Sequence, residues 1–243
     1  MPPIAGKSVV VTGGSRGVGR GLVEKLLARG NRVIATSRRS PDDADPSLAA
    51  LVAAHGGRLT LTQLDTAVPG SIAAWAAGLS THTPHVDVLI NNAGVYGRRL
   101  ALAEFEADDF TSVFQTNAVG PFLVVQQLLK HGLLGPPGSL VVNVSSVMAS
   151  HGDAAVSSVT PGGYAYRASK AALNIINKAL ALDLRDQQVD CVCVHPGYVQ
   201  TDMTGGAGWV TVDESTTGLL ALLEDGRPLN GRWYGYDGAE IPW

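Results

Sequence analysis

Cysteine is scarce in this chain, and long apolar runs are missing from it. The two cysteines, Cys191 and Cys193, stand at alternate positions of the apolar run 189–194. Alternate residues of a strand face the same side of a sheet, and a regular strand does not give them the geometry of a disulfide. We therefore expect two small core residues in a reducing compartment, and a cytoplasmic protein.

Membrane, nucleic-acid and metal signals are lacking as well. No apolar run reaches the roughly 18 residues that span a bilayer, and residues 1–7 carry no signal-peptide pattern. The net charge is −3 with no basic block, which argues against a nucleic-acid partner. The six histidines are scattered, and His82 and His85 flank a proline-containing loop without a cysteine or carboxylate cluster. We expect no membrane partner, no nucleic-acid partner and no metal site.

The chain does contain a regular alternation of apolar runs and helical patterns. Its 243 residues, 45% hydrophobic and 16% charged, suffice for a buried core, and we expect one domain over residues 1–243. The alternation predicts an α/β fold, a single-domain Rossmann fold with a doubly wound parallel sheet of about seven strands and helices on both faces. Ligands of such sheets bind beyond the carboxyl ends of the strands. The predicted strands cover residues 7–12, 31–37, 58–64, 86–90, 139–145, 189–195 and 231–236.

A glycine-rich turn follows the first predicted strand and opens a helix over residues 16–29. Glycines allow a sharp turn and a close approach of the backbone to a pyrophosphate, and the helix N-terminus offers free N–H groups. A glycine-rich connection that binds nothing is the alternative. The candidate dinucleotide-binding residues of the turn are Gly13, Ser15, Arg16, Gly17, Val18 and Gly19.

The end of the second strand favours one dinucleotide over the other. Arg38 lies 21 residues after Gly17, and no Asp or Glu occupies residues 33–41. An acidic residue here would bind a free ribose 2′-hydroxyl, whereas an arginine suits a 2′-phosphate. Arg16 could reach the same phosphate. Both could be ordinary surface arginines, but their coincidence favours NADP(H) over NAD(H).

Polar residues also follow the third and fourth strands. Asp65 is a candidate for binding the adenine amino group, and Asn91-Asn92-Ala93-Gly94 suits a turn held by side-chain amides. Further along, residues 107–134 read as one long helix that carries Asn117. Because Pro121 has no N–H to donate to the carbonyl four residues earlier, we expect the carbonyl and side chain of Asn117 to be free for another partner. A kinked helix with a solvated Asn117 is the alternative.

Tyr166 and Lys170 lie four residues apart in the helical run 165–184 and share one helix face. A free tyrosine titrates near pH 10, and a neighbouring positive charge lowers its pKa (about 10 in model peptides). The pair is a candidate for acid–base catalysis. The alternative is that both side chains simply lie on a solvated face of the helix. Two segments flank it: residues 147–165 read as a loop, and residues 198–210 read as a flexible lid.

These motifs together resemble the short-chain dehydrogenase/reductase family, in its short single-domain branch, over nearly the whole chain. Thr12 to Gly19 matches the family's T-G-x-x-x-G-x-G, Asn91 to Gly94 matches N-N-A-G, and Tyr166 to Lys170 matches Y-x-x-x-K. Pro196-Gly197 matches the P-G after the sixth strand. Within the family, residues 164–170, 195–203 and 236–243 look like the sniffer and C-factor type carbonyl reductases.

The resemblance implies a role for each matching residue. Tyr166 would protonate the carbonyl oxygen, and Lys170 would lower the pKa of the phenol and bind the nicotinamide ribose. Ser146 would hydrogen-bond the substrate oxygen, and Asn117 would hold a water that links Lys170 to solvent. The remaining cofactor-binding candidates are Asn92, Ala93, Gly94, Pro196, Gly197, Val199 and Thr201.

Two assignments involve a choice between neighbours. Tyr164 has Ala168 four residues on, so only Tyr166 has a lysine partner. Ser146 is preferred to Ser145 because the apolar alternation of the strand puts Ser146 at the family's serine position. The 19 residues between Ser146 and Tyr166 exceed the usual family spacing, and we expect the extra residues to form a loop at the rim of the substrate pocket.

The leading functional hypothesis is an NADP(H)-dependent carbonyl reductase that acts on a small ketone or aldehyde, or on the corresponding alcohol. A non-catalytic NADP-binding sensor or signalling protein on the same fold is the alternative. An epimerase or dehydratase of the extended branch fits less well, because only about 45 residues follow Pro196-Gly197. The family also implies a homodimer or homotetramer, formed through the helices that carry Asn117 and Tyr166.

Overall fold

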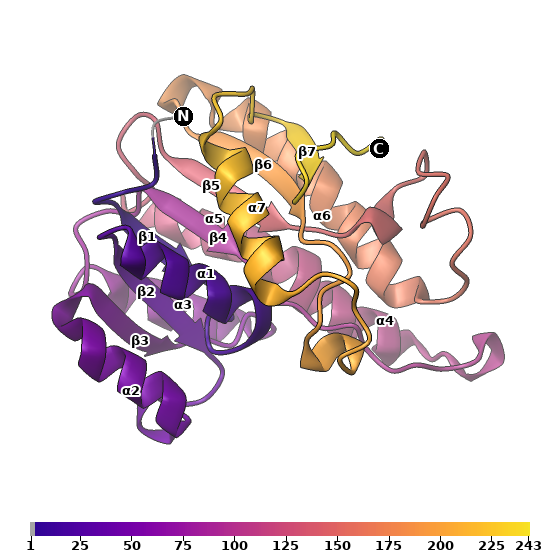
Figure 1. Ribbon diagram of the computed structural model, residues 1–243, viewed down its shortest axis with the longest axis horizontal. Helices are drawn as coiled ribbons and strands as arrows, with labels where there is room; N and C mark the ends of the chain where they lie inside the picture. The colour runs from indigo at the N-terminus through magenta and orange to yellow at the C-terminus, as the bar shows by residue number, and fades with distance from the viewer. Residues whose placement is uncertain (1–2) are drawn as a thin grey trace.

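The computed structural model describes residues 3–243, and its centre is one parallel sheet (Figure 1). The strand order β3-β2-β1-β4-β5-β6-β7 reverses direction between β1 and β4. Such a reversal opens a crevice at the carboxyl ends of the two strands, where open α/β sheets bind ligands. The predicted doubly wound fold is confirmed. The strands are β1 (Ser8–Val11), β2 (Arg32–Ser37), β3 (Leu59–Gln63), β4 (Val88–Asn91), β5 (Leu140–Val144), β6 (Asp190–His195) and β7 (Arg232–Gly235).

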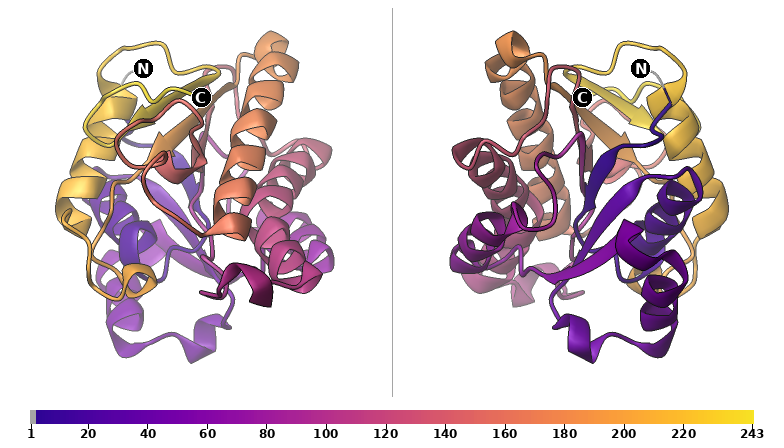
Figure 2. Two further views of the ribbon diagram at one scale, coloured as in Figure 1. Left: turned by 90° about the vertical axis from the view of Figure 1, so that its right-hand side faces the viewer. Right: turned by 90° about the vertical axis from the view of Figure 1, so that its left-hand side faces the viewer.

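Helices cover both faces of this sheet. In Figure 2, α7 lies on one side of the strands and α6 on the other. No helix among residues 3–243 combines the length and apolar character needed to cross a membrane. The helices are α1 (Gly17–Ala28), α2 (Pro46–His55), α3 (Pro69–Leu79), α4 (Ala107–Phe114), α5 (Gly120–Lys130), α6 (Tyr164–Asp183) and α7 (Val212–Glu224).

The two apolar cores follow from alternation along the strands. In β1, Val9 packs with α1 and α7 on one face, whereas Val10 packs with α3 and α5 on the other. All three valines of β1 are fully buried, as expected for a central strand with helices on both sides. Cys191 and Cys193 are free and buried, and burial raises the pKa of the Cys191 thiol to about 12. These thiols are core residues rather than reactive groups.

The prediction of one continuous helix over residues 107–134 is wrong. A π-helical turn, Gln115–Val119, separates α4 from α5, and α5 ends at Lys130. The Gly120 N–H donates back to the Gln115 carbonyl across this widened turn. The missing N–H of Pro121 disfavours regular i−4 bonding at this position, and such bulges are a frequent way to accommodate the break.

The segment between β5 and α6 forms the expected loop and is tied down at three points. It begins with a short 3₁₀ turn, Val147–Ala149. The Ser150 hydroxyl donates to the Pro242 carbonyl at 2.5 Å, and the Gly152 N–H donates to the Trp243 carbonyl at 3.0 Å. Arg167 on α6 donates to the Thr160 carbonyl at 2.6 Å. The chain end and α6 therefore hold this loop beside the sheet edge.

Candidate active site

A cleft of about 1530 Å³ runs along the carboxyl ends of the strands. Its walls are formed by the glycine-rich turn after β1, the ends of β2 and β3, the Asn92–Gly94 segment, the end of β5, α6 and the segment after β6. All of the predicted site residues line it except Asn117. The cleft is large enough for an extended dinucleotide together with a small substrate. Among residues 3–243, no three His, Cys, Asp or Glu side chains are grouped so that they could hold a metal ion.

The glycine-rich turn passes closely under the segment that follows β4. Asn92 donates from its side-chain amide to the Thr12 and Gly13 carbonyls, both at 3.0 Å. The Thr12 hydroxyl in return accepts from the Asn92 and Ala93 N–H groups at 3.0 and 3.1 Å. A methyl group at Gly19 would overlap the Gly13 carbonyl oxygen and the Asn92 amide. The N-N-A-G segment therefore fixes the conformation of the turn, and Gly19 leaves the space that this packing needs.

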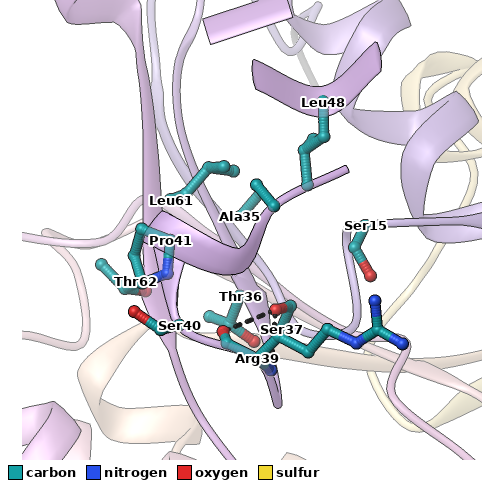
Figure 3. Close-up of a pocket in the computed structure, with 11 residues that line it drawn as sticks. Ser15, Ala35, Thr36, Ser37, Arg39, Ser40, Pro41, Leu48, Leu61 and Thr62 are labelled. Carbon is teal, nitrogen blue, oxygen red and sulfur yellow. Dashed lines mark hydrogen bonds between the residues drawn. The ribbon is translucent and has the colours of Figure 1, made fainter. Parts of the chain in front are cut away.

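Arginines gather at the end of β2. Arg38 and Arg39 are exposed and line the cleft, and the Ser37 hydroxyl accepts from the Arg39 N–H at 3.1 Å. Figure 3 shows the small pocket at this strand end, where the Arg39 side chain extends toward Ser15 in the glycine-rich turn. The site thus has two arginines at the strand end, of which the sequence analysis selected only Arg38.

Arg16 has a partner that the sequence did not indicate. Its guanidinium forms an ion pair with Asp202 at 3.0 Å, and both side chains are mostly exposed. This pair joins the glycine-rich turn to the segment after β6. Thr201 lies beside the same turn, because a methyl group at Gly17 would be 3.3 Å from Thr201 Cγ2.

Asp65 and Pro196-Gly197 also lie where they were expected, on the wall of the cleft. One carboxylate oxygen of Asp65 accepts from the Ala67 N–H at 2.9 Å and so shapes the turn after β3. Gly197 has φ +90°, and a side chain there would strike the Tyr236 ring. The Pro196 carbonyl accepts from the Ser215 hydroxyl at the start of α7 at 2.6 Å.

Ser146 and Tyr166 meet at the end of β5. Burial raises the pKa of Tyr166 above its usual value. A hydrogen bond from Ser146 acts in the opposite direction but is the smaller effect. Tyr96 adds to the rise. The direction is opposite to the one that a neighbouring ammonium was expected to produce. The Tyr166 hydroxyl is therefore protonated at neutral pH.

Lys170 lies behind the tyrosine on the same helix face. It is 4% exposed, and its Nζ donates to the Val144 carbonyl at 2.7 Å and lies 6.0 Å from the centre of the Tyr166 ring. Burial lowers the pKa of Lys170 to about 8. A methyl group at Gly94 would be 3.5 Å from this nitrogen. Glycine at position 94 therefore leaves room beside the ammonium group.

Asn117 corrects one expectation. Its side chain is not free: Oδ1 accepts from the Val95 N–H at 2.9 Å, while Nδ2 donates to the Val95 carbonyl at 2.8 Å and to the Ser169 hydroxyl at 3.0 Å. The residue is fully buried, so it is not solvated either. Its side chain holds the segment after β4 against α6, directly behind Lys170.

Besides Arg39, sequence reasoning did not single out Tyr96, Arg99 or His195, which also line the cleft. Tyr96 stacks on Tyr166 with ring centres 4.9 Å apart, and the guanidinium carbon of Arg99 lies 4.5 Å from the centre of the Tyr96 ring. His195 lines the cleft at the end of β6, and burial lowers its pKa to about 4. A tyrosine and an arginine shortly after N-N-A-G give no periodic signal, although their position beyond a strand end places them at the ligand edge.

Comparison with known proteins agrees with this geometry. The family model for short chain dehydrogenases matches residues 7–208, and the chain belongs to that family. The C-signal protein of Myxococcus xanthus is 40% identical over 163 residues, which are 66% of this chain and 95% of that protein.

Two solved structures match over almost their full length. The NADPH-bound carbonyl reductase from chicken fatty liver has a TM-score of 0.87 and 31% identity, covering 98% of this chain and 100% of that chain. Carbonyl reductase Sniffer of Drosophila melanogaster has a TM-score of 0.86 and 27% identity with the same coverage. The predicted family resemblance, including its similarity to the sniffer and C-factor group, is confirmed.

Proposed function

We propose that this protein is an NADP(H)-dependent carbonyl reductase that converts a ketone or aldehyde into an alcohol. One observation carries the proposal: a protonated, half-buried Tyr166 lies beside Ser146 and Lys170 in the same cleft as the glycine-rich turn. A protein that only binds a dinucleotide has no need of a positioned acid. The chicken and Drosophila carbonyl reductases share the fold and support this reading.

The residues present fit NADP(H). The glycine-rich turn would receive the pyrophosphate, Arg38 and Arg39 would receive the 2′-phosphate, and Asp65 would face the adenine. The space that Gly94 leaves beside Lys170 suits the nicotinamide ribose. When bound, the cofactor supplies the hydride for the carbonyl carbon.

Side chains of the protein carry out the proton transfer. The Tyr166 hydroxyl gives its proton to the carbonyl oxygen as negative charge develops there, and the Ser146 hydroxyl donates a hydrogen bond to the same oxygen. The Lys170 ammonium then stabilises the phenolate that remains, because opposite charges a few ångströms apart in a buried site attract strongly. Asn117 keeps the wall behind Lys170 in place through the hydrogen bonds of its side chain to Val95. Its backbone carbonyl, to which Pro121 has no N–H to donate, would hold a water that links Lys170 to solvent.

Tyr166→Phe tests the proposal, and Tyr164→Phe is the matched control. Tyr164 begins the same helix two residues earlier, is 40% exposed, and packs edge-on against Phe105. We expect Tyr166→Phe to lower kcat for NADPH-dependent aldehyde reduction by a factor of about 10² or more. NADPH binding, followed by its fluorescence, should persist. Activity of Tyr166→Phe within tenfold of the wild type would refute the role of this residue.

A signalling role without turnover is the second candidate, because a 40% identical relative carries the name C-signal. The same assay separates the two. Clear NADPH binding without NADPH consumption across a broad carbonyl panel favours the second candidate, whereas consumption that depends on Tyr166 favours the first.

We also propose that residues 1–243 form one domain, that the chain associates as a homodimer or homotetramer, and that it is cytoplasmic. A single sheet that includes all seven strands supports the first proposal. Exposed apolar side chains on α4, α5 and α6, among them Phe110, Phe122 and Ile175, support the second. The two buried thiols support the third. Light scattering coupled to size exclusion would measure the assembly.

A further inference from the structure

Arg99 stands at the substrate end of the cleft without an acidic partner. No carboxylate of residues 3–243 lies within ion-pair distance of it, whereas its neighbour Arg98 pairs with Asp109 at 3.3 Å. Among residues 3–243, the one polar contact of the Arg99 side chain is a long hydrogen bond of 3.5 Å to the Met203 carbonyl. A guanidinium has five N–H donors, so most of its hydrogen-bonding capacity is available to a ligand.

Aromatic rings connect this guanidinium to the reacting group. Arg99 lies over Tyr96, and Tyr96 lies over Tyr166, at the stacking distances of 4.5 and 4.9 Å. The guanidinium carbon is therefore no farther from the centre of the Tyr166 ring than the sum of these two distances, a span that one small aromatic or similarly sized molecule can bridge. Stacking also holds Arg99 above the cleft in one direction, so less side-chain entropy is lost when a ligand binds.

At the substrate end of the cleft, the distribution of charged side chains favours an anion beside Arg99. The carboxylates Asp153 and Asp237 line the cleft from the loop after β5 and the turn after β7. In the sheet, β5 and β6 separate the end of β4, which leads to Arg99, from β7. Asp202, next to Met203, is already paired with Arg16. The substrate end is thus positive on the β4 side and negative on the β7 side.

We propose that the preferred substrate is a ketone or aldehyde whose far end carries a carboxylate, which Arg99 binds while Tyr166 meets the carbonyl oxygen. This proposal rests on the proposed reductase function. The anion would form charge-assisted hydrogen bonds with the planar guanidinium, which matches a carboxylate in two-point geometry. Arg99 is a specificity-determining residue in this scheme and takes no part in proton transfer.

The test compares para-carboxybenzaldehyde with its methyl ester as substrates at saturating NADPH. The variants are Arg99→Gln, Arg99→Lys and, as a control, Arg32→Gln. Arg32 is an exposed arginine that begins β2, at the opposite end of the strands from the cleft, so its removal changes the net charge equally. We expect the wild type to favour the acid over the ester in kcat/KM by about fivefold, the upper range for a partly exposed ion pair.

Arg99→Gln should remove this preference through KM for the acid, Arg99→Lys should keep part of it, and Arg32→Gln should match the wild type. Added salt should weaken the preference of the wild type. An ester preference in the wild type, or an acid preference that survives in Arg99→Gln, overturns the proposal.

Equilibrium binding separates failure of this proposal from failure of the proposed function. Calorimetry in the presence of NADPH would measure the dissociation constants of para-(hydroxymethyl)benzoate and its methyl ester, the two alcohol products. The alcohols and NADPH are both reduced, so no hydride transfer disturbs the measurement. An Arg99-dependent preference for the acid supports the carboxylate site even if no aldehyde is reduced, in which case the reductase function fails alone. Equal binding of acid and ester by the wild type overturns the carboxylate site, whatever the turnover.

Discussion

Ser145 and Asn174 are joined by a buried hydrogen bond, in which the serine hydroxyl donates to Asn174 Oδ1 at 2.6 Å. This contact ties the end of β5 to the middle of α6 inside the protein. Ser146, the next residue, has an extended backbone, and successive side chains of an extended chain point to opposite sides. Of two adjacent serines, one is thus a structural contact and the other faces Tyr166.

The two serine-to-alanine variants should therefore have different defects, one in catalysis and the other in stability. Ser146→Ala should lower kcat/KM for carbonyl reduction by about a hundredfold, because a hydrogen-bond donor to the developing oxyanion is lost. Ser145→Ala should lower the free energy of unfolding by about 1–3 kcal/mol, because Asn174 is left with an unsatisfied buried oxygen. Steady-state kinetics and urea unfolding of both variants would measure this. The reverse assignment of effects would contradict the geometry.

Gly19 should tolerate no side chain, in contrast to a glycine on α3. Gly19→Ala pushes a methyl group into the Gly13 carbonyl and the Asn92 amide, so it should distort the turn and weaken NADPH binding by at least about tenfold. Gly78→Ala is the control, because a methyl group there meets nothing within 4 Å. That variant should gain about 0.5–1 kcal/mol in stability, since alanine is the better helix former. NADPH titrations and thermal unfolding distinguish the two, and normal NADPH affinity in Gly19→Ala would disprove the tight packing.

Arg38→Ala should change the choice of cofactor more than the rate. Loss of this guanidinium removes a partner for the 2′-phosphate, and kcat/KM with NADPH should fall about tenfold while the value with NADH changes little. Arg32→Ala, at the other end of the same strand, is the charge-matched control. If the NADPH to NADH ratio stays the same in Arg38→Ala, either Arg39 alone binds the phosphate or NADP(H) is not preferred.

Local sequence patterns were enough to predict the frame of the site. The glycine-rich turn lies between a buried strand and an amphipathic helix, and Tyr166 and Lys170 share one helix face, both of which are short-range regularities. Parallel strands bring their carboxyl ends to one edge, so Arg38 and Ser146 could be placed together without coordinates. The comparisons with other proteins support the same frame.

What could not be predicted depends on contacts between distant segments. The side chain of Asn117 is satisfied by the backbone of Val95, a contact across 22 residues that no spacing rule encodes. The stack of Arg99, Tyr96 and Tyr166 joins a loop to a helix, and the bond from Ser150 to Pro242 spans 92 residues. Such contacts arise from the packed fold, so the walls of the substrate pocket were the least predictable part.

His195 should contribute to the acid sensitivity of the fold. Its Nδ1 is buried without a hydrogen-bond partner among residues 3–243, and burial lowers its pKa to about 4 against the opposing effects of Asp237 and Asp153. Between pH 6.5 and 4 the unfolded chain thus binds a proton that the folded chain does not, so the free energy of unfolding falls as the pH falls.

His195→Gln should reduce that loss by up to about 3 kcal/mol between pH 7 and pH 4. Urea unfolding at several pH values would show it as a flatter slope, while His82→Gln, at an exposed histidine in the loop after α3, should keep the slope of the wild type. Equal slopes in the wild type and His195→Gln would mean that the imidazole is accessible to protons in the folded state, and that its burial at the end of β6 carries no cost.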